Sequence, residues 1–170
     1  MLKGTLLSAI LITASVASPL IYRQGVGVVT TSPTASQEVS SAITSFSDDV
    51  NTVSTALMAL KSETDANTIT AIATNGLSAE SDEDNQRQVL FRFAGDAGTD
   101  SNQLITTFTP DVLNGFQAII NNPSPGTAQD QAQQISLIRN TNILPSITGL
   151  ANAALAGVGE GPSAPSFTPT

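Results

Sequence analysis

Four acidic residues lie close together near the middle of the chain, Glu80, Asp82, Glu83 and Asp84. Carboxylates at this density could bind a divalent cation, because hard metals take several oxygen ligands. The glycine-bearing twelve-residue loop of a calcium site is missing around them. Negative side chains also stabilise the positive end of a helix macrodipole. We therefore expect these residues to begin a helix at about residue 82 and to bind no metal.

The chain lacks the residue types on which hydrolytic catalysis depends. It has no histidine, cysteine or tryptophan and one tyrosine, Tyr22. Its serines have no histidine to act as a general base, and it has no thiolate for nucleophilic attack or metal binding. A glycosidase carboxylate pair would lack aromatic platforms for a sugar. The sequence therefore predicts a protein that is not an enzyme, with no catalytic residue and no cofactor.

Arginine is the residue type most suited to binding a small anion here. Arg87 and Arg92 flank VLF in the stretch QRQVLFRF, and either could hold an anionic head group at the mouth of an apolar cavity. The alternative is an exposed arginine that pairs with a carboxylate one helical turn away, such as Arg87 with Glu83. We favour the ion-pair interpretation over anion binding.

Two glycines follow directly, Gly95 and Gly98 in AGDAG. Each would cost about 1 kcal/mol relative to alanine inside a helix. They would permit close helix packing, a kink, or a gap that admits a ligand. If the glycines open a gap that admits a ligand, the candidate ligand-binding residues are Phe93, Gly95, Gly98 and Arg92.

A long helix is predicted to come before these residues, over about 34–62. Pro33 suits a first turn, Ser32 can cap it, and no glycine or proline interrupts it. Its apolar positions recur at steps of four and three, the spacing of a seam in a bundle or coiled coil. The stripe comprises Val39, Ile43, Phe46, Val50, Val53, Leu57 and Leu60.

Shorter helices are predicted for the rest of the domain. Their expected ranges are 66–77, with a bend or end at Gly76; 82–108; 110–120, begun by Thr109 and Pro110; 128–140, capped by Thr127; and a last helix that ends before Gly157. No segment alternates with a period of two. The predicted fold class is all-α, an antiparallel helical bundle of five or six helices with one long N-terminal helix and no sheet.

Both ends of the chain are expected to lie outside this bundle. Residues 1–17 have a lysine, an apolar run and small residues before a cut, which is the layout of a secretory signal peptide. Residues 18–33 are predicted to be a flexible leader, in which Arg23 is a weak candidate for a second processing site. The bundle domain is expected over 34–157 and a disordered tail rich in Pro, Ser and Thr over 158–170.

Composition narrows the possible partners. Fourteen acidic residues against six basic ones give a formal net charge of −8, which repels phosphate backbones and argues against nucleic acid. The apolar stretch near the start is too short to span a bilayer, so no transmembrane anchor is expected. The polar surface is mostly Ser, Thr, Asn and Gln, which suits a secreted, extracellular or cell-wall protein.

The stretches DDVNTVSTALMAL and ILPSITGLANAAL, in an exported chain without cysteine, resemble fungal small secreted cell-wall proteins. More loosely, the chain resembles the hydrophobic surface-binding protein A and cell-wall galactomannoprotein group. The resemblance covers most of residues 34–157 and transfers no individual site residue. It implies a helical bundle that binds hydrophobic surfaces or encloses a fatty acid.

Two functions follow as hypotheses. The first is a secreted, non-enzymatic binding protein that holds a fatty acid or another apolar ligand, or adsorbs to hydrophobic surfaces through amphipathic helices. The second is a structural or host-interaction protein, resembling an effector, with a fully packed core and no ligand. Cell-wall polysaccharide and host proteins are further candidate partners.

Overall fold

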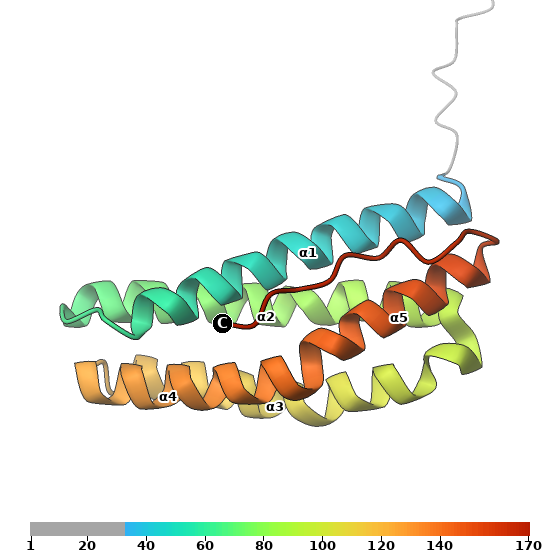
Figure 1. Ribbon diagram of the computed structural model, residues 1–170. Helices are drawn as coiled ribbons and strands as arrows, with labels where there is room; N and C mark the ends of the chain where they lie inside the picture. Colours follow the sequence, from blue (N-terminus) through green and yellow to red (C-terminus); the bar gives the residue numbers. More distant parts are fainter. Residues whose placement is uncertain (1–32) are drawn as a thin grey trace, which may run out of the picture. The chain divides into compact units, whose positions relative to one another are not determined.

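The computed structural model describes residues 33–170 (Figure 1). The predicted signal peptide, Arg23 and all of the predicted leader except Pro33 lie outside the described residues. Within residues 33–170 there is no strand, so the all-α class is confirmed. The elements are α1 Ala35–Leu60, α2 Ala66–Ala94, the 3-10 turn η1 Gly95–Gly98, α3 Thr99–Asn121, α4 Pro125–Ile138, the π-helical segment η2 Arg139–Ile143 and α5 Leu144–Gly157.

Helix α1 matches its sequence prediction closely. Thr34 caps it in place of the expected Ser32: its side chain accepts from the Gln37 N–H, and Gln37 Oε1 accepts from the Thr34 N–H. This reciprocal pair satisfies two N–H groups that the first turn leaves free. The predicted apolar stripe is buried along its length, except for the half-buried Ile43.

Helix α2 is longer than predicted because Gly76 does not end it. A Cβ at Gly76 would lie 2.6 Å from the Phe116 ring, so this glycine lets α3 pack closely against α2. The predicted end near residue 77 and new start at residue 82 were therefore wrong. Residues 80–84 lie well inside α2 and not at the positive end of a helix.

The real break comes at Gly95, inside the predicted helix 82–108. Gly95 has φ of 55°, in the region that favours glycine, and it ends α2. Pro110, expected to start a helix, lies inside α3. A helical proline leaves the carbonyl four residues earlier without its N–H donor, but Thr106 and Pro110 are both exposed, so water can reach that group.

Residues 125–157 form one helical run with a wider turn in the middle. Ser124 caps α4 and Pro125 occupies its first turn. The Leu144 N–H then donates to the Arg139 carbonyl, five residues back, which is the π-helical pattern of η2. The separate last helix that the sequence predicts is therefore joined to α4, because a π segment continues directly into α5.

The bundle contains three long helices and not one, since α1, α2 and α3 have 26, 29 and 23 residues. Helix α1 packs mainly on α2, and α2 also packs on α3 and α5 (Figure 1). Helix α4 packs on α3 and α1. Contact between α1 and α5 is slight by comparison, and the C-terminal chain runs between these two helices (Figure 1).

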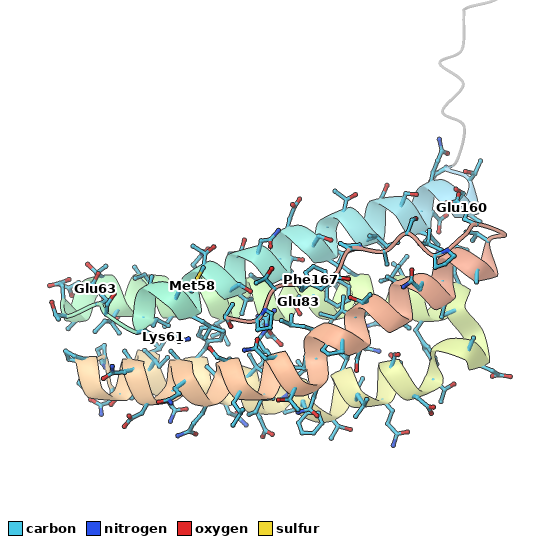
Figure 2. All side chains as sticks on the ribbon, viewed as in Figure 1. Met58, Lys61, Glu63, Glu83, Glu160 and Phe167 are labelled. Atoms are coloured by element: carbon cyan, nitrogen blue, oxygen red, sulfur yellow. The ribbon has the colours of Figure 1, made fainter. Side chains whose placement is uncertain are left out.

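The C-terminal residues 158–170 pack against the bundle, in place of the disordered tail that the sequence predicts. The chain turns back after α5 and runs along it beside α1 (Figure 1). Ala164 and Phe167 pack against the apolar core, with Phe167 lying between α1 and α5 (Figure 2). Composition suggested disorder because the tail has no helical period, but these two side chains and its backbone hydrogen bonds hold it in place.

The close crossing of α5 over the end of α2 provides a first test of the fold. A Cβ at Gly157 would lie 2.0 Å from the backbone oxygen of Phe93. We expect Gly157→Ala to lower the free energy of unfolding by about 1–3 kcal/mol, because backbone must shift to relieve the clash. Urea unfolding followed by circular dichroism measures this loss.

Gly126→Ala is the matched control, since a Cβ there meets nothing within 4 Å. It should leave stability unchanged or raise it by up to about 1 kcal/mol, because alanine is the better helix former. Equal effects of the two substitutions would contradict the close crossing.

Candidate functional site

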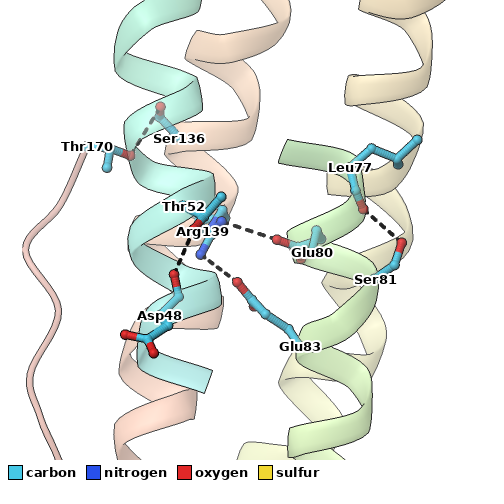
Figure 3. A network of polar contacts seen from close by, with 9 residues as sticks. All are labelled: Asp48, Thr52, Leu77, Glu80, Ser81, Glu83, Ser136, Arg139 and Thr170. Carbon is cyan, nitrogen blue, oxygen red and sulfur yellow. Dashed lines mark hydrogen bonds and ion pairs between the residues drawn. The ribbon is translucent and has the colours of Figure 1, made fainter. Parts of the chain in front are cut away.

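The most unusual feature of the core is a buried cluster of three charged side chains, which we call the ion centre: Glu80, Glu83 and Arg139 (Figure 3). Arg139 is 1% exposed, Glu80 0% and Glu83 3%. Arg139 Nη1 donates to Glu80 Oε2 at 3.2 Å, and Nη2 donates to Glu83 Oε1 at 3.1 Å. The planar guanidinium thus joins two carboxylates on a neighbouring helix.

The helical spacing positions these groups. Residues three apart lie on the same face of a helix, so Glu80 and Glu83 both point inward from α2. Asp82 is exposed and Asp84 is half-buried. Arg139 is the first residue of η2. The acidic run is therefore divided between two inward and two outward carboxylates, and it is not one cluster.

Burial favours the neutral form of this centre's acids. Loss of solvation raises the pKa of Glu80, against the opposing charge and hydrogen bond of Arg139. Burial raises the pKa of Glu83 well above its usual range, and the negative charges of Glu80 and Asp49 add to the effect. One proton held by the glutamate pair makes the centre neutral with Arg139, the state a low-dielectric interior favours.

This geometry supports a structural role. All three side chains are closed off from solvent, so no substrate reaches them. Glu80 Oε1 is buried and makes no hydrogen bond. Among the residues that the structure describes, no three His, Cys, Asp or Glu side chains are grouped so as to hold a metal ion. The ion centre joins α2 to η2 and fixes which residues of the two elements lie opposite each other.

The arginines of the predicted ligand site lie nearer the surface. The Arg92 side chain is 60% exposed, forms an ion pair with Glu38 of α1, and stacks over the Phe93 ring at 4.6 Å from its centre. Arg87 pairs with Asp84 at 2.7 Å instead of the expected Glu83. Both arginines therefore form ion pairs, but the partner of Arg87 is Asp84 and not Glu83.

The two glycines of the predicted site serve the turn and the packing. Gly95 makes the turn at the end of α2, and a Cβ there would meet nothing within 4 Å. A Cβ at Gly98 would lie 2.8 Å from Leu150 Cδ1, so α5 fills the space beside it. Of the alternatives considered for AGDAG, close packing describes Gly98, whereas Gly95 ends the helix in a turn that the sequence analysis did not expect.

An apolar gap lies elsewhere, beneath the C-terminal residues. It has an empty volume of about 170 Å³ and no room for a water molecule. We call it the apolar slot, and its walls are Ile43, Phe46 and Ser47 of α1, Leu90 of α2, Ile147 and Ala151 of α5, and Pro165 and Phe167. The one hydroxyl, on Ser47, donates to the Ile43 carbonyl at 2.7 Å and so presents no free polar group.

The slot is closed by residues 161–170, which we call the strap. The Asn140 side chain donates to the Thr170 carbonyl at 2.9 Å and accepts from the Thr170 N–H at 3.1 Å. Thr148 Oγ1 donates to the Pro165 carbonyl at 2.8 Å, and Asn152 Oδ1 accepts from the Ala164 N–H at 3.0 Å. Three side chains of η2 and α5 thus bind the backbone of the strap.

The sequence contains one indication that the strap packs against the bundle. Phe167 is a large apolar residue in a tail of small and polar ones, and such an isolated aromatic residue indicates an anchor. The side of the strap that faces the bundle, and the helical residues that bind it, could be identified only from the structure.

Comparisons with known proteins give no relative. No protein-family model matches the chain, and neither the search of curated proteins nor that of solved structures found a match. None of the helices between residues 33 and 170 is both long and apolar enough to cross a membrane.

Removing the cation from the ion centre should destabilise the fold strongly. We expect Arg139→Met to lower the free energy of unfolding by about 3–5 kcal/mol at pH 7, because it leaves the buried negative charge of the glutamate pair without a counter-charge. Urea unfolding at pH 7 measures this loss. Adding Glu80→Leu and Glu83→Leu to the same chain should recover most of it, and a triple variant as weak as the single one would contradict the charge argument.

The raised pKa of Glu83 makes stability depend on pH. A glutamate whose pKa is higher in the folded chain contributes its stability at low pH, and this is lost as the pH rises from about 4.5 to the folded value. The pKa of Asp65 is lowered by hydrogen bonds from Thr68, so its contribution is lost only below about 3.8. We therefore expect stability to fall between pH 5 and pH 8 in the wild type and to fall less in Glu83→Gln.

Asp82→Asn is the control, because it removes the same charge at an exposed position of the same helix. It should keep the wild-type slope in urea unfolding measured from pH 5 to pH 8. An unchanged slope in Glu83→Gln would show that the ion centre binds no extra proton.

Proposed function

We propose that this chain is a secreted, non-enzymatic binding protein whose ligand is a fatty acid or a similar slender apolar molecule. The observation that carries the proposal is the apolar slot, a gap between α1, α2 and α5 that is covered only by the strap. Helices cover the rest of the core, whereas a segment without helical hydrogen bonds covers this face.

The chemistry of the slot favours an unbranched hydrocarbon. Its walls are aliphatic and aromatic, and their one hydroxyl is already bonded. Burial of apolar surface contributes about 25 cal/mol for each Å² removed from water. A methylene chain lying between α1 and α5 would gain this energy and would need no polar partner within the slot.

The residues that line the slot include no cation for a charged head group. Arg92 lies two residues after the slot residue Leu90 on α2, and its partner Glu38 lies just over one turn before Ile43 on α1. We assign Arg92 to the carboxylate of the ligand, with the Phe93 ring packed beneath its guanidinium. Gly95 and Gly98 position this end of α2 and need not touch the ligand.

The expected place of action is the extracellular space or the cell wall, as in the fungal secreted proteins that the sequence resembles. Adsorption to a hydrophobic surface would use the same apolar walls once they are uncovered. A second candidate function is a structural or host-interaction protein without a ligand. The slot has no room for a water molecule, which favours this second function because a closed, dry core requires no ligand.

Fatty-acid binding is tested by filling the slot. Ala151 is 2% exposed and lines the slot, so Ala151→Leu places three more carbons in the ligand's space. We expect it to weaken binding of palmitate at least about tenfold while the fold is retained, because the added carbons occupy the ligand's volume. Ala156→Leu, on the exposed face of the same helix, should bind as the wild type does.

Native mass spectrometry of the secreted protein, before and after organic extraction, shows whether a ligand is already bound, and isothermal titration with palmitate gives the affinities. No bound mass, no heat of binding and no rise in Tm with palmitate would together reject the proposal and favour the packed-core alternative.

A further inference from the structure

The strap is an extended segment with one face toward the bundle. Ala164, Phe167 and Thr170 are half-buried, and the residues between them are exposed. A repeat of three is that of a polyproline II helix, which rises about 3.1 Å per residue. From Ala164 to Thr170 the strap would therefore span about 19 Å. Its partners Asn152 and Asn140 are twelve helical residues apart, about 18 Å.

The strap can leave without breaking a helix. Its hydrogen bonds run to the side chains of Ser136, Asn140, Thr148 and Asn152, which can bond to water when the strap is gone. Glycine occupies positions 157, 159 and 161 where the chain turns back, and Gly159 has φ of 82°. Such a connection can change direction at low cost.

Phe167 is the part of the strap that fills the slot. With it in place the slot has no room for a water molecule, so an acyl chain cannot lie in the slot beneath a closed strap. If Phe167 left alone, the walls Phe46, Leu90 and Ile147 would face water, which is unfavourable. If an acyl chain took its place, these walls would stay covered.

We propose that the strap is a built-in competitor for the ligand, which closes the slot when the slot is empty and is expelled when an acyl chain enters. This inference rests on the proposed function and adds its regulation. Apparent affinity then depends on the fraction of molecules with an open strap. Entry of the ligand also releases an extended Pro- and Ser-containing segment from the surface.

Two substitutions that weaken the attachment of the strap to the bundle should raise the affinity for palmitate. In the full chain, Phe167→Ala should raise the affinity for palmitate about tenfold, because the slot loses its internal occupant. Asn140→Ala should raise it about threefold to tenfold, because two hydrogen bonds to Thr170 are lost. Asn142→Ala is the control: Asn142 lies in the same π segment but donates only to Ile138, so the affinity should stay within about twofold.

Isothermal titration gives these affinities, and hydrogen exchange with mass spectrometry follows the strap directly. The Ala164 and Thr170 N–H groups are hydrogen-bonded when the strap is closed. Saturating palmitate should therefore speed exchange across residues 161–170 in the wild type, to the rate seen in Phe167→Ala without ligand.

The outcomes separate the two proposals. If palmitate binds the wild type but Phe167→Ala weakens binding, or if the strap stays protected at saturation, Phe167 is a wall of the ligand site and the competitor role is rejected while fatty-acid binding stands. If palmitate binds neither the wild type nor the loosened variants, the proposed function fails and the strap is a permanent part of the core.

Discussion

The attraction of one buried guanidinium for two buried carboxylates constrains much of this bundle. A charge without a partner in the interior costs several kcal/mol, so Arg139, Glu80 and Glu83 must meet whenever the chain folds. That requirement fixes α2 against η2 along the helix axis. With Arg139 turned inward, the next residue, Asn140, lies outside the core and reaches the end of the strap. The ion centre and the cover of the slot are therefore positioned by two adjacent residues.

Local signals predicted α1 well and the other long helices less well. The stripe of α1 repeats over about six turns without interruption, and any neighbour with an apolar face satisfies it. Gly76 and Pro110 are helix breakers in isolation, but tertiary structure overrides them. The ring of Phe116 needs the space that Gly76 leaves, and the exposed side of α3 tolerates the proline. Gly95 ends α2 because its own φ of 55° turns the chain there.

The ion centre was harder to predict than the helices because its three residues are distant in sequence. The spacing of Glu80 and Glu83 places both on one helix face, yet their partner lies 59 and 56 residues away. Nothing in the stretch around Arg139 distinguishes it from a surface arginine. The strap raises the same difficulty: its composition favours disorder, and its order depends on Asn140, Thr148 and Asn152, whose common face appears only once α4, η2 and α5 form one run.

An extended strap fits the space between α1 and α5 better than another helix would. A helix with its side chains is about 10–12 Å across, whereas an extended strand of chain is slimmer and makes no internal hydrogen bonds. It must therefore take hydrogen bonds from the helices beside it, and those bonds run to side chains and not to the helical backbone. Segments held in this way open at a lower free energy than the core they cover. The apolar face under the strap is thus the part of the bundle most readily exposed, which is why we propose this face for both the ligand and its competitor.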